Sequence, residues 1–319
     1  MKIISKDNLK SNVTGVTWVK SCNKWGARIT VDKKQIYLGY YDEFDEAVEA
    51  RKNAEKLYLG KWKARTKYSY NKHYFDEIDT EEKAYWLGYI WSDCNVGKDG
   101  MHLKSIDKEH LEKFKKAIDG DMPIKQYKNK GYKMNSVYYQ ISIYDKKLVK
   151  LLSEKYKIIP YRRDDGETVT KTVPQIYSRD FIRGIIDANG SIVTSTLYNS
   201  GVNLSIMERL FILKYCNEHF NIILKKKRIE KYTKRHPGRD SNVYNLNITG
   251  NRQVFYILDN LYNNSCVYLD RKYNKYMELY TYYQEMIRID IETILGSGSE
   301  VKKKIILEMR DYFNKREEL

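Results

Sequence analysis

The sequence predicts an α+β protein in which a small domain of three strands and one helix precedes a larger core with the order αββαββα repeated twice. A short apolar helix pattern with a central glycine occurs at 85–93 and again at 181–190, and Gly88 and Gly184 are 184 − 88 = 96 residues apart. Strand and helix periodicities follow each copy in the same order. Before the first copy, three runs rich in β-branched and aromatic residues lead into an amphipathic helix.

Composition gives the first indication of function. The 319-residue chain has 58 Lys and Arg against 42 Asp and Glu, a net charge of +16, and this length allows two domains. Such a basic chain is expected to bind a polyanion, usually a nucleic acid, and an ordinary basic enzyme is the alternative. The four cysteines lack metal or disulfide spacing, and no membrane-spanning run or signal-peptide core is present. We therefore expect a cytoplasmic, nucleoid-associated protein of a bacterium or phage, without a membrane partner.

The first 60 residues form the predicted N-terminal domain. Strands are expected at 16–20, 25–31 and 35–40, followed by a helix over 42–57 with one apolar stripe. Because a helix laid on a three-stranded sheet covers only one face, alternation leaves the other face free. That free face is expected to carry Arg28, Thr30, Gln35 and Tyr37.

The segments Gly15-Val16-Thr17-Trp18, Lys24-Trp25 and Leu38-Gly39, with the alanine-rich helix after them, resemble an AP2-type DNA-binding domain over 11–60. The resemblance implies that the exposed sheet face lies in the DNA major groove. Matched residue by residue, it implies DNA contacts from Lys20, Arg28, Thr30, Gln35, Tyr37 and Tyr40. Ordinary solvated strand residues are the alternative at each single position. Residues 61–79 read as a basic connector, either a plain tether or a segment ordered on DNA.

The repeated core is expected in two halves, at 80–170 and 171–286. Each half begins with the glycine-bearing helix, and after it we expect strand, strand, helix, strand, strand, helix. In the first half these lie at 95–96, 101–106, 107–118, 124–130, 137–143 and 145–156; in the second half at 191–195, 202–207, 208–220, 225–232, 242–248 and 252–263.

The duplicated apolar helix, with its central glycine and an acidic or amide residue at its end, resembles the LAGLIDADG homing endonucleases of the two-repeat, monomeric type. The resemblance covers about 80–285 and implies that the two helices pack through Gly88 and Gly184 at a pseudo-twofold axis. It also implies a saddle of two four-stranded sheets on double-stranded DNA, and an acidic residue at the foot of each helix that binds Mg²⁺ or another divalent cation.

Position by position, the metal-binding and catalytic residues implied by the family are Asp93 and Asn189, and Arg162 and Lys272 are the implied catalytic cations. Asn189 departs from the pattern, because an amide oxygen can bind a cation but carries no charge and cannot act as a base. Asp187 is expected to cap or pack. Three interpretations stay open: the protein nicks one strand, it binds DNA with weak or no cutting, or position 189 carries an introduced replacement of aspartate.

Further DNA contacts are expected on the saddle. On the strand at 137–143 the alternating residues are Tyr138, Gln140 and Ser142, and the most basic hairpin carries Lys225, Lys227, Lys231, Arg235 and Arg239. For the hairpin, phosphate contact is favoured over a merely solvated charged face.

The sequence thus predicts a Mg²⁺-dependent, site-specific homing endonuclease of a mobile genetic element, which hydrolyses phosphodiester bonds in a long duplex target. The alternatives are a non-cutting DNA-binding regulator or intron-splicing partner, and an RNA-binding protein that uses the same basic face. The helical tail at 287–319 either braces the fold or contacts DNA or a partner.

Overall fold

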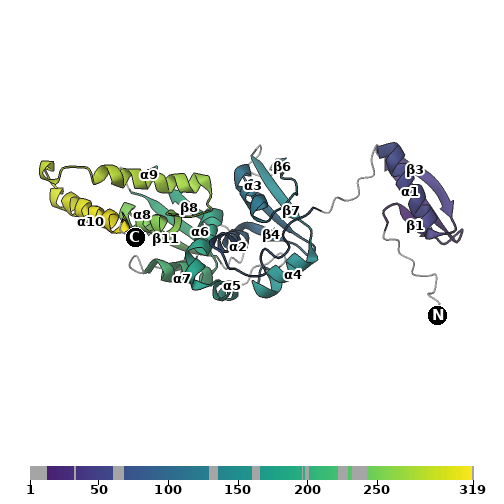
Figure 1. Cartoon of the computed structure of the whole chain (residues 1–319), viewed down its shortest axis with the longest axis horizontal. Coiled ribbons are helices and arrows are strands. Elements are labelled where there is room, and N and C mark those ends of the chain that lie inside the picture. Colours follow the sequence, from purple (N-terminus) through teal and green to yellow (C-terminus); the bar gives the residue numbers. More distant parts are fainter. Residues whose placement is uncertain are drawn as a thin grey trace. The chain divides into compact units, whose positions relative to one another are not determined.

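The computed structural model describes residues 13–31, 34–59, 68–128, 136–159, 166–195, 197, 201–221, 229–231 and 243–317. The chain divides into two compact units, Met1–Lys67 and Tyr68–Leu319 (Figure 1). No helix in the described ranges is both long enough and apolar enough to span a membrane.

The N-terminal unit is the predicted small sheet with one helix. Strands β1 (Val16–Val19), β2 (Lys24–Val31) and β3 (Lys34–Tyr41) form an antiparallel sheet in that order, and α1 (Phe44–Leu59) follows. Val16, Trp25, Ala27 and Ile29 are buried on one sheet face, together with Ala47 and Ala54 of the helix. The small alanine side chains let the helix lie close to the sheet, and the opposite face stays in solvent.

The second unit contains the predicted order αββαββα twice. The first half is α2 (Glu81–Asp93), β4 (Cys94–Val96), β5 (Met101–Ser105), α3 (Lys108–Ala117), β6 (Lys125–Lys128), β7 (Val137–Ile143) and α4 (Lys146–Lys155). The second half is α6 (Ser178–Asn189), β8 (Gly190–Val193), β9 (Asn203–Glu208), α7 (Leu210–Asn221), β10 (Ile229–Lys231), β11 (Tyr244–Thr249) and α8 (Asn251–Tyr262). Between them lie α5 (Glu167–Thr172) and a 3₁₀ turn at Gln175–Tyr177.

The two sheets have the same topology. Their strand orders are β4-β5-β7-β6 and β8-β9-β11-β10, and every neighbouring pair is antiparallel. In both sheets one face is apolar and buried, as the alternation along β5 and β9 shows: Leu103 and Leu204 are inaccessible to solvent. One continuous core joins both halves through α2 and α6, which confirms the α+β fold with a duplicated core.

Gly88 and Gly184 let α2 and α6 pack backbone against backbone. A Cβ atom on Gly88 would lie 2.1 Å from the carbonyl oxygen of Phe181, and one on Gly184 would lie 2.0 Å from the carbonyl oxygen of Tyr85. Positions 85 and 181 are also 181 − 85 = 96 residues apart, so each glycine meets the same place on the opposite helix. Such reciprocal contacts are the pattern of a local twofold axis.

The prediction of a connector over 61–79 is wrong from residue 68 onward. Residues 61–67 lie outside the described ranges, but the chain from Tyr68 belongs to the second unit. Tyr74, Phe75 and Ile78 are buried in its core, and the hydroxyl of Tyr156 donates to the backbone oxygen of Phe75 at 2.7 Å. A few large apolar side chains suffice to close one end of the first half, although the segment as a whole is polar.

The C-terminal residues brace the second half. Helix α9 (Asp270–Met286) leads through a 3₁₀ turn at Ile291–Thr293 to α10 (Ser299–Glu317), and both lie beside α8 in Figure 1. Met309 and Phe313 of α10 are buried in the core, and the Tyr312 hydroxyl donates to Asp259 of α8 at 2.7 Å. Of the two roles that the sequence left open for the tail, the structure shows packing on the fold.

Candidate functional site at the feet of the paired helices

Asp93 and Asn189 are the last residues of α2 and α6, and both are solvent-exposed. Each helix ends where the next residue, Cys94 or Gly190, takes an extended conformation and begins a strand. The side-chain nitrogen Nδ2 of Asn189 donates to the backbone oxygen of Ser92 at 3.2 Å. The foot of one helix is therefore bonded directly to the foot of the other, which brings the two predicted metal-binding positions together.

The side chain of Asn189 has a defined orientation. Nδ2 also donates to Oε1 of Glu208 at 3.1 Å. The two atoms that face Nδ2, the Ser92 carbonyl oxygen and Glu208 Oε1, are therefore both acceptors. Only the NH₂ group can satisfy two acceptors, and Oδ1 consequently points away from them. Sequence reasoning missed Glu208, because a glutamate at the end of a strand gives no signal of a contact 19 residues back along the chain.

The oxygen donors at the feet suit a hard divalent cation. The Asp93 carboxylate and the Asn189 amide oxygen are ligands of the type that Mg²⁺ and Ca²⁺ prefer, and the Ser92 hydroxyl oxygen is buried without a hydrogen-bond partner. The described part of the chain holds no group of three or more His, Cys, Asp or Glu side chains arranged to bind a metal ion.

Asp187 lies beneath this site and joins the two halves. Its fully buried carboxylate accepts from the Tyr85 hydroxyl at 2.8 Å, from the Tyr262 hydroxyl at 2.6 Å and from the backbone nitrogen of Leu269 at 2.8 Å. Burial raises the pKa of Asp187, and the nearby ammonium of Lys272 and these hydrogen bonds oppose the shift. Asp187 is thus a buried packing residue, as expected for it.

His110 of α3 completes the same network. Its Nε2 lies 3.1 Å from the Tyr85 hydroxyl, whose own proton is donated to Asp187, so Nε2 must carry the hydrogen of the imidazole. Its Nδ1 is buried without a partner. Burial lowers the pKa of His110 to about 3, and the charges of Lys113, Arg271 and Lys272 add to the effect.

Lys272, the implied catalytic cation of the second half, lies at the foot of α6. The side chain is only 4% exposed, and its Nζ donates to the backbone oxygens of Ile186, Asp187 and Gly190. All three N–H groups of the ammonium are therefore used at the C-terminal end of α6, where a cation also stabilises the helix dipole. Burial lowers the pKa of Lys272 to about 8. It supports the foot of α6 and has no donor left for a phosphate.

Several other predicted residues cannot be placed. Arg162, Lys225, Lys227, Arg235 and Arg239 lie outside the described residues. Lys231 belongs to β10, where its backbone pairs with that of Tyr244.

The outward face of the first sheet holds the predicted residues Tyr138, Gln140 and Ser142 among others that the sequence reasoning missed. Strand register places His102 opposite Ser142, Lys104 and Lys125 opposite Gln140, and Tyr127 opposite Tyr138. The Gln140 amide donates to the Ser142 hydroxyl at 2.8 Å, the rings of Tyr127 and Tyr138 stack at 5.4 Å, and Nζ of Lys104 lies 5.5 Å from the Tyr138 ring centroid. Alternation along 101–105 and 125–128 could have identified the missed residues.

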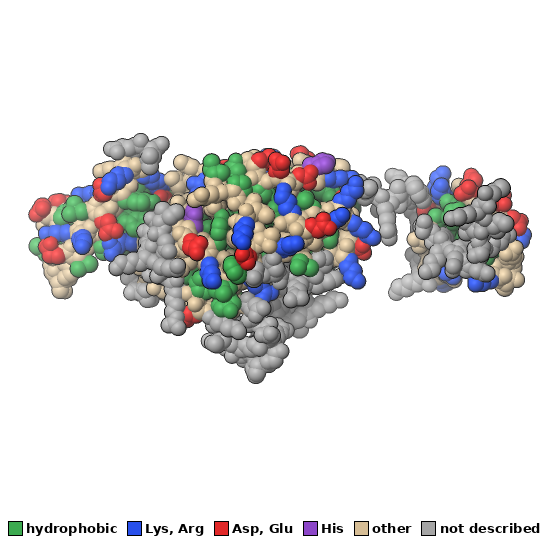
Figure 2. Space-filling view, turned by 90° about the horizontal axis from the view of Figure 1, so that it is seen from below, with side chains coloured by type: hydrophobic (Ala, Val, Ile, Leu, Met, Phe, Trp, Pro, Cys, Tyr) green, Lys and Arg blue, Asp and Glu red, His purple; other side chains and the backbone are tan. Residues whose placement is uncertain are grey.

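The outward face of the second sheet carries amide and hydroxyl side chains at the corresponding positions: Ser191, Asn203, Ser205, Asn245, Asn247 and Thr249. The side-chain oxygens of Asn203 and Asn245 are buried without a hydrogen-bond partner. Both sheets thus carry polar side chains on one face, a composition that can contact base edges, and in the second sheet the exposed Val193 and Met207 share that face. On the face shown in Figure 2, basic and acidic side chains are interspersed.

In the N-terminal unit, the five predicted sheet residues lie on one exposed face. Arg28 pairs directly with Tyr37 and Thr30 with Gln35 across β2 and β3. The register shifts by one residue between Ala27 and Arg28, where Gly39 has φ +127°. Because of this bulge, Tyr40 turns to the same side as Tyr37, and their rings meet edge to face at 5.1 Å. Lys20 is exposed in the turn after β1.

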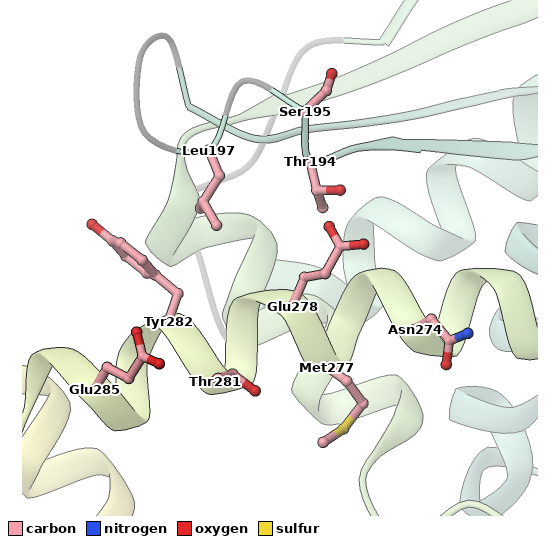
Figure 3. A pocket seen from close by; sticks show the side chains of 9 residues that line it. All are labelled: Thr194, Ser195, Leu197, Asn274, Met277, Glu278, Thr281, Tyr282 and Glu285. Carbon is pink, nitrogen blue, oxygen red and sulfur yellow. The ribbon is translucent and has the colours of Figure 1, made fainter.

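A pocket of about 600 Å³ lies between the segment after β8 and the helix α9. Figure 3 shows Glu278 of α9 directed toward Thr194, with Tyr282 and Leu197 at one side. Its charged lining residues are the two acidic side chains Glu278 and Glu285, which do not suit a phosphate backbone.

No protein-family model matches the chain, and no curated protein matches it. Among solved structures, the chain is similar to I-DmoI in complex with DNA and Mn (16% identity, 57% of this chain and 97% of that chain, TM-score 0.38). It is also similar to the homing endonuclease I-WcaI bound to its DNA recognition sequence (13%, 60% and 86%, TM-score 0.42). A third similar structure is the LAGLIDADG meganuclease I-AabMI bound to uncleaved DNA (13%, 70% and 97%, TM-score 0.38).

Proposed function

We propose that the protein is a site-specific DNA endonuclease of the LAGLIDADG homing type that hydrolyses phosphodiester bonds in a long duplex. One observation carries the proposal: the reciprocal contacts of Gly88 and Gly184 hold two helix ends together, and their last residues, Asp93 and Asn189, are oxygen donors exposed to solvent. Two sheets with polar outward faces belong to the same unit, which supports a duplex as the substrate.

The residues at the feet have distinct roles in this proposal. When bound, Mg²⁺ or another divalent cation would stabilise the charge that develops on the phosphate and would lower the pKa of a bound water. Asp93 would hold it with a charged oxygen and Asn189 with a neutral one. Asp187, Lys272 and Tyr85 are buried beneath the two helix ends and support them through hydrogen bonds.

DNA contacts are assigned to three faces. The first sheet offers Tyr138, Gln140 and Ser142 with Lys104 and Lys125, and the second sheet offers its row of asparagine and hydroxyl side chains. The AP2-like sheet of the N-terminal unit, with Arg28 and Tyr37 exposed, extends the contact to a further stretch of the duplex. We propose that the protein acts as a monomer, because a single chain already contains both halves. We also propose that a mobile element encodes it, in keeping with the homing type of endonuclease.

The test begins with a target duplex selected from a random library by the full-length protein. Supercoiled plasmid that carries this target is then incubated with Mg²⁺. We expect open-circular or linear product, and a loss of roughly 100-fold or more in rate for Asp93→Asn without loss of duplex binding. Asp99→Asn, which changes an exposed aspartate paired with Lys146, is the matched control. Cleavage by Asp93→Asn at the wild-type rate would contradict the assignment.

The second candidate function is a DNA-binding protein that does not cut, and the neutral Asn189 favours it. It predicts specific binding of the selected duplex with the plasmid left supercoiled at every Mg²⁺ concentration. The same plasmid assay therefore separates the two functions.

A further inference from the structure

Glu208 is a buried carboxylate at the foot of the second half. It ends strand β9 and is 7% exposed. Its Oε1 accepts from Nδ2 of Asn189 at 3.1 Å, and its Oε2 accepts from its neighbour's backbone nitrogen, that of Arg209, at 2.9 Å. In the described ranges no Lys, Arg or His forms an ion pair with it. Buried carboxylates are normally paired with a cation or bind a metal ion, so this charge is only partly compensated.

The contact between positions 189 and 208 needs a hydrogen-bond donor on one side and an acceptor on the other, which the Asn189 amide and the Glu208 carboxylate provide. In an Asn189→Asp variant, a carboxylate oxygen would replace Nδ2. It would face the Ser92 carbonyl oxygen and the Glu208 carboxylate, which are both acceptors, at the distances that Nδ2 now has from them. Two carboxylates so close repel each other unless a cation lies between them. The amide instead donates to both acceptors, so the asparagine at 189 is matched to the glutamate at 208.

The first half shows the complementary arrangement. Gly190 and Cys94 are equivalent, because each directly follows the glycine-bearing helix of its half. Gly190 pairs with Ile206 and Cys94 pairs with Leu103, so Ile206 is equivalent to Leu103. Two residues further along these strands, Glu208 is therefore equivalent to Ser105. The first half therefore has a carboxylate at the helix foot and a serine at the strand end. The second half has an amide at the helix foot and a carboxylate at the strand end. At these two positions each half has one acidic group, on the helix in the first half and on the strand in the second.

We propose that Glu208 is the acidic cation ligand of the second half and that Asn189 positions it. This inference rests on the proposed function, since it concerns the same divalent cation. It assigns one carboxylate to each half, Asp93 to the first and Glu208 to the second. The departure of Asn189 from the family pattern is then a relocation of the charge rather than its loss.

The test uses full-length protein with Glu208→Gln, Asn189→Asp and the exchanged double variant Asn189→Asp/Glu208→Gln. Glu218→Gln, at an exposed glutamate of α7, is the matched control. Binding of Mn²⁺ alone is measured from the electron paramagnetic resonance signal of the free ion. We expect Glu208→Gln to weaken Mn²⁺ binding by about tenfold or more, and the double variant to recover it, because the charge returns to the helix foot.

Thermal unfolding provides a readout that needs no metal. At pH 7.5 in a chelator, Asn189→Asp alone is expected to lower the midpoint by ~3 °C, because two carboxylates then face each other. Adding Glu208→Gln to it is expected to restore the midpoint. Wild-type Mn²⁺ binding in Glu208→Gln, or an Asn189→Asp variant as stable as the wild type, would overturn the inference.

The two proposals fail separately. If the wild type cleaves plasmid in an Asp93-dependent manner while Glu208→Gln binds Mn²⁺ like the wild type, Glu208 is not the ligand and the endonuclease stands. If the plasmid stays intact with the wild type, the endonuclease assignment fails whatever Glu208 binds.

Discussion

Alanine at Gly184 tests the helix contact on which the site depends. The added Cβ would lie 2.0 Å from the Tyr85 carbonyl oxygen and 2.9 Å from the Tyr89 nitrogen, whereas ordinary contact begins near 3.4 Å. Both neighbours are backbone atoms, so no side-chain rotation relieves the overlap, and the helices must separate by up to 3.4 − 2.0 = 1.4 Å. Alanine gains about 1 kcal/mol of helix propensity, but overpacking of this kind costs about 3 kcal/mol or more. We expect a net loss of roughly 2 kcal/mol or more in the free energy of unfolding.

The assay is urea unfolding of the full-length protein, followed by far-ultraviolet circular dichroism. Gly88→Ala should lose a similar amount, because its Cβ would meet Phe181 in the equivalent place at 2.1 Å. The double variant should lose less than the sum, since helices already separated by one methyl group accommodate the second more easily. Glu154→Ala, at an exposed position of α4, is the control and should change stability by less than about 0.5 kcal/mol. A Gly184→Ala protein as stable as the wild type would refute the close approach of the helices.

Two further predictions concern the network below the feet. Because burial lowers the pKa of His110 from 6.5 to about 3, the unfolded chain binds a proton that the folded protein does not, so stability is lost as the pH falls below 6.5. At about 1.4 kcal/mol per unit, the loss between pH 6.5 and pH 5 is roughly 2 kcal/mol, and His110→Gln should remove this difference in urea titrations at the two pH values; an unchanged dependence would contradict it. Lys272→Met leaves three carbonyl oxygens at the end of α6 without their charged donor and should reduce the free energy of unfolding by roughly 2–5 kcal/mol. Wild-type stability in that variant, with activity lost, would instead show that Lys272 acts in the chemistry.

Local patterns in the sequence determined the elements and their order. Periodicity of apolar residues is a property of consecutive positions, so it predicts strands, helices and their repetition without any knowledge of distant contacts. The glycine in the middle of each apolar helix is visible for the same reason, as are the oxygen-bearing residues Asp93 and Asn189 that follow it. Duplication then predicted that the two helices form equivalent contacts, and the structure places Gly88 and Gly184 in them.

The surroundings of each polar group were decided only by the tertiary structure. Lys272 is 82 to 86 residues from the carbonyls that it binds, and Glu208 is 19 residues from Asn189, so no local pattern records either contact. Tyr37 and Tyr40 have opposite parity along β3, and only the bulge brings their rings to one face. The sequence by itself therefore determined the strands and helices of the small domain and of the two core halves, and that the core order occurs twice, but not the short helix α5 between the halves. Only the tertiary structure decided which polar and charged groups meet at the helix ends. The partners of a charge are set by distance in space, and residues far apart in the sequence come together there.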